Sequence, residues 1–365
     1  MIRDLLVVGG YGVVGRRVVA HLAPLFPGHV IVGGRDESKA TLLSRDVASG
    51  ARGRRVDVNE PACMDAALDG VGTVISCVAQ REPHLLRAAV ARGLGYTDTA
   101  PRLAFWRADD ALIAQAKETG ARIVLGAGLS PGVSNMMAAR MATLLGGSVD
   151  SIETAIALSL GDEYGRDSMA HVFESLARPF EVFQQGRHEV AVPFTQGAVV
   201  SFPKPVGLRR AYVFPWSDVA NYPTTLGAQT SVGRFALLPP WLGYTANRLM
   251  RLGVGGLLQS KSATASGSRR AIDGLKRRYA GRDEFALVVR AERGGRSLAM
   301  WLGGRGQASI TAFAAAEFAR LLAEGAVQQP GIWLPEQAVE HERFFTSLGK
   351  AGWTVSDTPH GGAAH

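Results

Sequence analysis

Residues 5–15 have the sequence LLVVGGYGVVG and decide the fold of the first part of the chain. The four apolar residues predict a buried strand, the glycines a tight turn, and the apolar positions after Gly15 a helix. Gly10, Gly12 and Gly15 have the spacing G-x-G-x-x-G, which permits a tight turn, close approach to a pyrophosphate and close packing of helix on strand. The motif predicts a dinucleotide site in which N–H groups of the helix start face the phosphates; the alternative is a plain glycine turn.

Length and composition favour an intracellular protein of two domains. The chain has 365 residues, 47% apolar and 20% charged, which argues against wholesale disorder. The two cysteines, Cys63 and Cys77, have no metal-type or C-x-x-C spacing, so we expect a cytoplasmic location, no metal and no disulfide framework. The first strand starts at once and no apolar run approaches about 18 residues, so we expect neither a signal peptide nor a membrane span.

The positive charge is concentrated in one stretch of the chain. Lys204–Arg282 contains 13 basic and two acidic residues, or +11, and because the whole chain carries +8 the remainder carries −3. An arginine-rich solvated surface explains this, and so does attraction to acidic substrates or an anionic membrane surface. Nucleic acid is not expected as a partner, because no recognised binding motif accompanies the basic pairs.

Residues 1–147 alternate short apolar runs with amphipathic stretches, as in a doubly wound parallel α/β sheet of Rossmann type. The expected strands are Leu5–Val8, Val30–Gly33, Gly53–Val56, Thr73–Cys77 and Arg122–Leu125. The expected helices are Val13–Pro24, Ser38–Ser49, Pro61–Leu68, Pro83–Arg92 and Ala104–Thr119.

After residue 147 the pattern predicts a second domain of α+β type over residues 148–325, followed by a C-terminal segment, 326–365. Ser151–Leu160 alternates like a strand, and Ser168–Arg178 is expected to be helical. Phe285–Arg290 and Ser297–Leu302 flank two glycines as in a hairpin. Ala308–Glu324 is a helix by composition.

The end of the second strand suggests which nucleotide binds. Arg35 is expected to meet a 2′-phosphate, with Lys39 one turn further on, which favours NADP (NADPH) over NAD. Asp36 is expected either to bind a ribose hydroxyl or to cap the following helix. Asp57, after the third strand, is expected either to contact the adenine edge or to cap the helix that begins near Pro61.

Three later segments are expected at the same edge of the sheet. Ser76, Cys77 and Val78 end the fourth strand, below the nicotinamide, and Cys77 is expected to be a small buried residue rather than a nucleophile. Tyr96–Thr99 are expected in a loop in which Asp98 orients substrate, transfers protons or caps a helix. Residues 126–135 connect a strand to a helix, with Ser130 as cap and Pro131 in the first turn. The helix N–H groups beyond Gly132 would then bind a carboxylate or carboxamide.

These segments together resemble the saccharopine dehydrogenase-like family of NAD(P)-dependent reductases, from residue 1 to about 340. The resemblance implies a Rossmann domain, a separate substrate and dimerisation domain with a homodimer, and a C-terminal segment that returns to the first domain. It also implies hydride transfer between NADP(H) and a carbon–nitrogen bond. The residues that carry it are Gly9–Gly15, Gly34-Arg35, Asp57, Ser76-Cys77, Tyr96-Thr97-Asp98, Gly128–Gly132, Thr311-Ala312, Leu321-Leu322, Gly325 and Pro330–Glu336.

The mechanistic hypothesis is that hydride passes from NADPH to an imine or carbonyl in an interdomain cleft. Asp98, Tyr164 and His171 are the candidate proton donors, and His171 has the pKa best matched to neutral pH. Arg166 is the candidate partner of a substrate carboxylate, beside Ser130, Pro131 and Gly132. The expected cofactor-binding residues are Gly10, Tyr11, Gly12, Val13, Val14, Gly15, Arg35, Asp57, Ser76, Cys77 and Val78.

Two other functions stay open at this point. The aromatic and basic stretch from Pro203 to about Leu258 departs from what an amino-acid-binding domain suggests, so the small-molecule substrate is either acidic or apolar. One alternative is therefore a reductase of lipid-like substrates at a membrane surface. The other is a non-catalytic NADP sensor, which would bind the cofactor without turnover.

Overall fold

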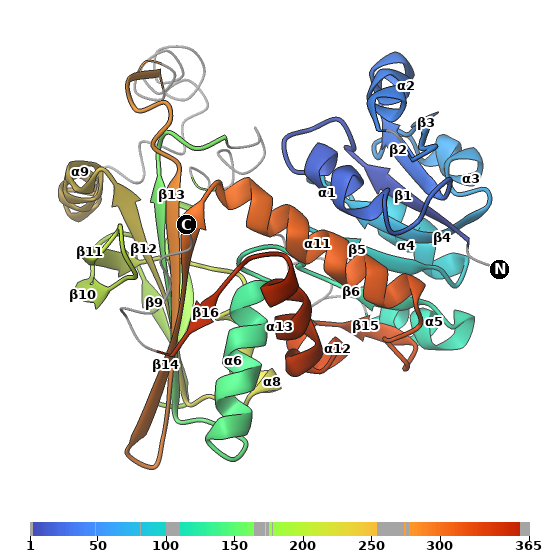
Figure 1. The fold of residues 1–365 in the computed structure, drawn as a ribbon. Coiled ribbons are helices and arrows are strands. Elements are labelled where there is room, and N and C mark those ends of the chain that lie inside the picture. Colours follow the sequence, from blue (N-terminus) through green and yellow to red (C-terminus); the bar gives the residue numbers. More distant parts are fainter. Residues whose placement is uncertain are drawn as a thin grey trace. The chain divides into compact units, whose positions relative to one another are not determined.

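The computed structural model describes residues 3–47, 49–80, 82–99, 110–163, 178–253 and 277–357, with single positions at 172, 175, 176 and 274. The chain divides into two compact units, drawn in Figure 1. Unit 1 comprises Met1–Val133 and Ala308–Phe344, and unit 2 comprises Ser134–Gln307 and Phe345–His365. Each unit therefore has one short segment from the C-terminal part of the chain.

Unit 1 contains a seven-stranded parallel sheet with the order β15-β6-β5-β4-β1-β2-β3. Its first six strands follow the order 3-2-1-4-5-6 of doubly wound nucleotide-binding sheets, which confirms the predicted fold class. The strands are β1 (Asp4–Val8), β2 (Val30–Gly34), β3 (Arg52–Arg55), β4 (Val71–Ser76), β5 (Gly95–Asp98), β6 (Arg122–Val124) and β15 (Gly331–Trp333).

Strand β5 corrects one expectation, because Tyr96–Thr99 were predicted in a loop. Gly95–Asp98 instead pairs with β4, and Gly95–Thr97 pairs with β6. Tyr96 and Thr97 are completely buried. The strand was missed because Gly95, Thr97 and Asp98 interrupt the apolar run that marks the other central strands.

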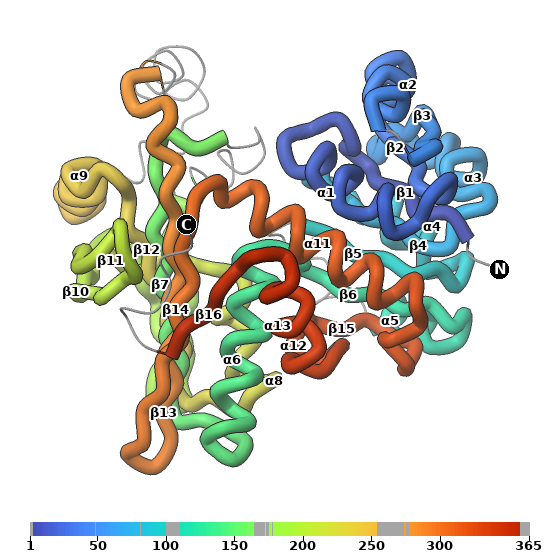
Figure 2. The backbone as a smooth tube through the Cα atoms, in the orientation of Figure 1, coloured from blue at the N-terminus to red at the C-terminus, as the bar shows by residue number. Residues whose placement is uncertain are grey.

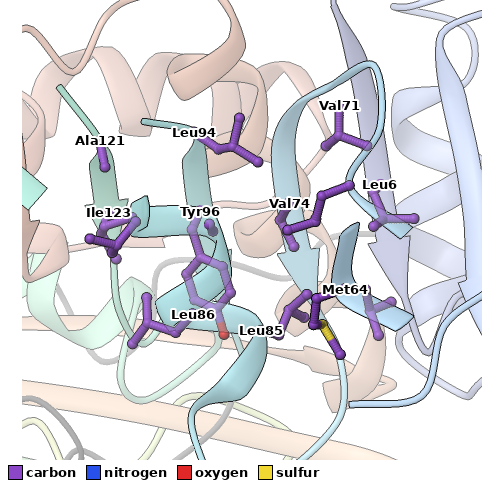
Figure 3. Close-up of a cluster of buried hydrophobic side chains, with 14 of the residues drawn as sticks. Leu6, Met64, Val71, Val74, Leu85, Leu86, Leu94, Tyr96, Ala121 and Ile123 are labelled. Atoms are coloured by element: carbon purple, nitrogen blue, oxygen red, sulfur yellow. The ribbon is translucent and has the colours of Figure 1, made fainter. Parts of the chain in front are cut away.

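Helices cover both faces of the unit 1 sheet, and consecutive residues of β1 enter different cores. Leu6 and Val8 belong to a core with residues of α3, α4 and α5, part of which is shown in Figure 3. Leu5 and Val7 belong to the other core, with residues of α1 and α11. The helices are α1 (Gly15–Leu22), α2 (Glu37–Asp46), η1 (Pro61–Cys63), α3 (Met64–Ala67), α4 (His84–Ala91), α5 (Asp110–Thr119), α11 (Gln307–Ala323) and α12 (Pro335–Ala338). Helix α13 (His341–Lys350) begins in unit 1 and continues into unit 2 at Phe345.

Helix α11 lies in unit 1, whereas the sequence-based border at residue 325 assigned this stretch to the second domain. Ala312, Ala315, Ala316 and Ala319 pack in the core beneath β1 and β2. Such a helix is apolar on all sides, so its sequence pattern does not show which sheet it covers. The chain then adds β15 beside β6, with Gly331 opposite Arg122.

Unit 2 is built on a mixed nine-stranded sheet, in which β7 pairs parallel with β12 and antiparallel with β13. The predicted hairpin is present and can be followed as a continuous tube in Figure 2; Gly294 and Gly295 turn the chain with φ of 54° and 78°. The strands are β7 (Ser151–Ser159), β8 (Phe180–Gln184), β9 (Arg187–Ala191), β10 (Gly197–Ser201), β11 (Leu208–Val213), β12 (Thr230–Leu238), β13 (Glu284–Arg293), β14 (Arg296–Arg305) and β16 (Val355–Ser356). Its helices are α6 (Val133–Leu144), α8 (Tyr222–Thr225) and α9 (Pro240–Arg251).

The unit 2 sheet curls, so that β10 approaches β14. The indole Nε1 of Trp301 donates a hydrogen bond to the carbonyl oxygen of Ser201 at 2.9 Å. Val200, Phe202 and Trp301 share a buried core with alanines of the central strands. These small side chains leave room for the larger residues of β10 and β14 inside the curl.

Candidate dinucleotide-binding site

The predicted cofactor residues of unit 1 come together at the carboxyl edge of its sheet. In the strand register, Val8 lies opposite both Gly33 and Ser76, and Ser76 lies opposite Asp98. The segments that follow β1, β2, β4 and β5 therefore start at the same edge. Because the strand order reverses between β1 and β4, this edge is the topological switch point at which such sheets bind ligands.

The glycine turn after β1 is compact because Gly9, Gly10 and Gly15 have no room for a side chain. Gly9 has a φ of 77°, and a Cβ there would lie 2.5 Å from Cγ1 of Val78. A Cβ at Gly15 would overlap the carbonyl oxygen of Gly9 and lie 2.8 Å from Cα of Gly10. Gly15 thus lets α1 pack directly on the end of β1.

Gly12 is different, because the space beside it is open. A Cβ at Gly12 would have only the carbonyl oxygen of Gly9 within 4 Å, at 3.1 Å, and the residue is exposed. Within the described residues, no backbone carbonyl accepts from the N–H groups of Val13 and Val14, which precede α1. An open glycine followed by free N–H groups fits a pyrophosphate at this helix start.

Tyr11 connects the glycine turn to the loop after β2. Its ring covers Gly34 so closely that a Cβ on Gly34 would overlap it. Its hydroxyl oxygen accepts a hydrogen bond from the N–H of Asp36 at 3.2 Å. The turn that would hold the pyrophosphate and the loop that would meet the adenosine ribose are thereby held together.

Arg35 is available for a ligand, whereas Asp36 is already engaged. Arg35 is exposed and has no hydrogen bond or ion pair with any residue that the structure describes. One oxygen of Asp36 accepts from the N–H of Lys39 at 3.1 Å, and the other lies 3.4 Å from Nζ of Lys39. These contacts, led by the Lys39 N–H, lower the pKa of Asp36. Asp36 is therefore the N-cap of α2.

Asp57 forms a turn within its own segment. Its Oδ1 accepts from the N–H of Asn59 at 3.0 Å and from the Asn59 side chain at 3.2 Å. The N-cap position of the helical turn Pro61–Cys63 is occupied by Glu60. The helix-cap alternative for Asp57 is therefore wrong, and contact with the adenine edge stays a prediction.

Ser76, Cys77 and Val78 lie against the glycine turn. The N–H of Cys77 donates to the carbonyl oxygen of Val8 at 2.9 Å, and the hydroxyl of Ser76 donates to the carbonyl oxygen of Val78 at 3.3 Å. Burial, with a smaller contribution from the Asp98 carboxylate, raises the pKa of the Cys77 thiol to about 12. Cys77 is thus a thiol at neutral pH, as expected for a residue that is not a nucleophile.

The raised pKa of Cys77 predicts a pH dependence of stability. Above about pH 9, the ordinary pKa of the thiol, the unfolded chain loses this proton while the folded chain keeps it until about pH 12. The free energy of unfolding should therefore fall as pH rises, by up to about 1.4 kcal/mol per pH unit. Urea unfolding between about pH 8 and 10 would measure it. Cys77→Ala should remove this fall and Cys63→Ala should retain it; equal slopes in both variants would refute the assignment.

Asp98 holds the loop that joins β6 to α6. Its Oδ1 accepts from the N–H of Gly126 at 2.9 Å, and its backbone carbonyl accepts from the N–H of Ala127 at 2.6 Å. Its other carboxylate oxygen accepts from the Tyr96 hydroxyl at 3.4 Å. A single residue at the end of β5 therefore fixes the start of residues 126–132.

The loop itself corrects the expectation for Ser130 and Pro131. Helix α6 begins at Val133, so neither Ser130 as cap nor Pro131 in the first turn describes the structure. The carbonyl oxygen of Pro131 instead accepts a hydrogen bond from the N–H of Gly128 at 2.7 Å, and Gly132 has a φ of 130°. This turn is closed on itself before the helix starts. Whether Ser130, Pro131 and Gly132 bind substrate stays a prediction.

Replacing Asp98 separates a positioning role from a chemical one. Asp98→Ala leaves the Gly126 N–H without its acceptor and should cost about 2 kcal/mol of unfolding free energy, with most of the turnover. Asp98→Asn keeps an amide oxygen as acceptor, so we expect it to restore most of both. If Asp98→Asn has wild-type stability in urea but is as inactive as Asp98→Ala, the carboxylate transfers protons. Asp46→Ala, an exposed carboxylate in the last turn of α2, is the matched control.

Two buried hydrogen-bonded pairs were not predicted from the sequence. The Gln80 side chain donates to the Tyr96 hydroxyl at 2.8 Å, and both residues are buried next to Asp98. Burial, with the Asp98 carboxylate, raises the pKa of Tyr96 well above its ordinary value. In unit 2, Ser134 at the start of α6 donates to the buried Asp218 carboxylate at 2.5 Å. The one sequence signal for the Gln80–Tyr96 pair is that Tyr96 belongs to an apolar strand that ends in the polar residues Thr97 and Asp98.

Three of the candidate site residues predicted in the second domain lie outside the described residues. They are Tyr164, Arg166 and His171. Most of the expected helix Ser168–Arg178 also lies outside the described residues. Among the residues that the structure does describe, no group of three His, Cys, Asp or Glu side chains could hold a metal ion. In the same part of the chain, no helix is long and apolar enough to cross a membrane.

The strand order, the glycine turn at the switch point and the open helix start define a dinucleotide-binding protein of the Rossmann class. Residues 5–124 match the family model of the saccharopine dehydrogenase NADP binding domain. This region therefore contains a nucleotide-binding domain of the saccharopine dehydrogenase type, which supports an NAD(P)-dependent oxidoreductase.

A solved structure shares the fold. Apo saccharopine dehydrogenase (L-Glu forming) from Saccharomyces cerevisiae has a TM-score of 0.70 at 15% identity, over 97% of this chain and 99% of that chain. A DAP dehydrogenase from C. glutamicum in complex with DAP has a TM-score of 0.45 at 14% identity, over 93% and 95% of the two chains. None of the curated proteins compared with the sequence matches it.

Proposed function

We propose that the protein transfers a hydride from NADPH to a small-molecule substrate with a C=N or carbonyl group. The proposed preference for NADPH rests on the different surroundings of Arg35 and Asp36. Arg35 is exposed without a partner among the described residues, while the Asp36 carboxylate is bound to Lys39. A free guanidinium suits a 2′-phosphate, and an occupied carboxylate is poorly placed for the 2′-hydroxyl of NAD.

The residues of the sheet edge would perform the binding and orienting steps. Gly12 leaves space for the pyrophosphate, and the N–H groups of Val13 and Val14 would donate to it. Bound NADPH would supply the hydride. Asp98 would orient the turn that contains Ser130–Gly132, beside which we propose that substrate binds.

The acceptor group and the proton donor are the less constrained parts of the proposal. The family name and the enzyme from yeast point to carbon–nitrogen bonds, the bond type present in saccharopine. We place the proton donor among Asp98, Tyr164, His171 and water, and the partner of a substrate carboxylate at Arg166. We also propose that residues 148–307, the part of the expected second domain that lies in unit 2, carry the substrate and dimerisation surfaces. Light scattering of the purified chain would test for a dimer.

Turnover against a panel of acceptors tests the function. The purified chain with NADPH would be mixed with imines formed from 2-oxo acids and amines, with ketones, and with enoyl and long-chain carbonyl compounds. Substrate-dependent NADPH oxidation that is lost in Gly12→Ala would support the proposal. Tight NADPH binding with no oxidation across the panel would contradict it and favour a cofactor sensor. Oxidation of the long-chain compounds alone would favour a lipid-like substrate.

A further inference from the structure

Helix α9 in unit 2 is held firmly on one side. It packs against β11 and β12, as Figure 1 shows. Gly243 and Met250 are buried on its inner side, and a Cβ at Gly243 would lie 3.2 Å from the Tyr212 ring. Asn247 donates to the carbonyl oxygen of Phe194 at 2.5 Å. The helix is thus a fixed part of the fold, and its orientation is determined.

The opposite side of α9 exposes large apolar and aromatic side chains. Trp241, Tyr244, Arg248 and Leu252 follow one another at helical spacing, and we call them the α9 face. Trp241 is 45% exposed, Tyr244 53% and Leu252 78%. Single exposed apolar residues are common, but three along one side of a helix form a patch that requires an explanation.

The surroundings of the α9 face are cationic. Helix α9 contains Arg248 and Arg251 and no acidic residue. At its other end, the Trp241 indole is 3.3 Å from the Tyr279 hydroxyl, and the guanidinium carbon of Arg282 lies 5.6 Å from the Tyr279 ring centroid. Asp283, next to Arg282, is paired with Arg305 at 2.6 Å. Within the described residues, neither Arg248 nor Arg282 has an ion pair.

We propose that the α9 face docks the protein on an anionic lipid bilayer. Trp and Tyr side chains favour the boundary between headgroups and acyl chains, and basic residues near an anionic surface add attraction. Arg248 and Arg282 would contact lipid headgroups while Trp241 and Leu252 enter the apolar boundary. A second copy of the chain fits less well, because a symmetric contact through this face would place arginines opposite arginines.

Vesicle co-sedimentation tests the proposal on the full chain. The vesicles would be phosphatidylcholine alone and phosphatidylcholine with phosphatidylglycerol. The charge variant is Arg248→Ala with Arg282→Ala, and the apolar variant is Trp241→Ala with Leu252→Ala. The matched control is Arg296→Ala with Leu144→Ala, two exposed positions away from α9. Thermal unfolding of each variant would establish that the fold is retained.

We expect wild type and control to bind the anionic vesicles much more tightly than the neutral ones. Loss of two basic contacts should weaken this binding roughly 30-fold, and the apolar variant should weaken it to a similar extent. No binding above the vesicle-free sample, or equal binding of all variants, would overturn the proposal. It would also be overturned if the protein bound heparin or DNA but not vesicles. Dissociation of a dimer by the apolar variant would assign the face to self-association.

Discussion

Gly15→Ala should destabilise unit 1 by about 3 kcal/mol, although alanine is ordinarily the better helix residue. The added Cβ would overlap the carbonyl oxygen of Gly9 and press on Cα of Gly10. Both are backbone atoms at the end of β1, so they cannot rotate aside as a side chain could. Helix α1 would have to move away from the strand and loosen the core that contains Val18 and Val19.

Gly12→Ala is the matched comparison in the same turn. Its Cβ has only the Gly9 carbonyl oxygen within 4 Å, at 3.1 Å, so we expect a stability change below about 1 kcal/mol. The methyl group would instead occupy the space proposed for the pyrophosphate and weaken NADPH binding. Urea unfolding and NADPH fluorescence titration measure the two effects. If Gly12→Ala binds NADPH like wild type, the pyrophosphate does not lie there.

Arg35→Ala should weaken NADPH binding roughly 10- to 100-fold and leave NADH binding unchanged, because only NADPH has the 2′-phosphate. Arg35 is exposed without a partner among the described residues, so its loss should not alter stability. Titration of the variant with both nucleotides would measure the ratio of the two dissociation constants. This ratio distinguishes a phosphate contact from general damage to the site.

Lys39→Ala is the control for net charge near the ribose. Lys39 Nζ is 3.4 Å from Asp36, so this cation already has an anionic partner in the N-cap of α2. We expect its loss to reduce NADPH affinity less than about threefold. Equal effects of Arg35→Ala and Lys39→Ala would show that the site responds to overall charge. An unchanged NADPH affinity in Arg35→Ala would refute the NADP assignment.

Most of the nucleotide-binding unit could be predicted from the sequence because its signals are local. Strand β1 was recognised from the consecutive apolar residues Leu5–Val8, which are buried on both faces of the sheet. The glycine spacing then specifies the turn to α1 regardless of the rest of the chain. The hairpin around Gly294 and Gly295 was predictable for the same reason, since its turn geometry depends on adjacent residues alone.

Contacts between distant segments were not predictable. The hydrogen bond from Gly126 to Asp98 and the one from Gln80 to Tyr96 join residues that no local pattern relates. Helix α11 was recognised as a helix, but its place in unit 1 depends on which core accepts its alanines. The closed turn at Pro131 likewise replaced a helix start that the local sequence had suggested.

The sequence by itself determined a dinucleotide-binding α/β unit, because strand, glycine turn and helix follow from neighbouring residues. The sequence also contains two neighbouring residues that point to different nucleotides: Arg35 favours NADP, and Asp36 would suit the ribose hydroxyl of NAD. The tertiary structure adds that Asp36 is bound to Lys39 and that Arg35 is exposed without such a partner among the described residues, which supports the proposed preference for NADPH. The structure also shows that a side chain has space at Gly12 but not at Gly15. This difference is absent from the sequence, because the space around a residue depends on atoms that only folding brings near.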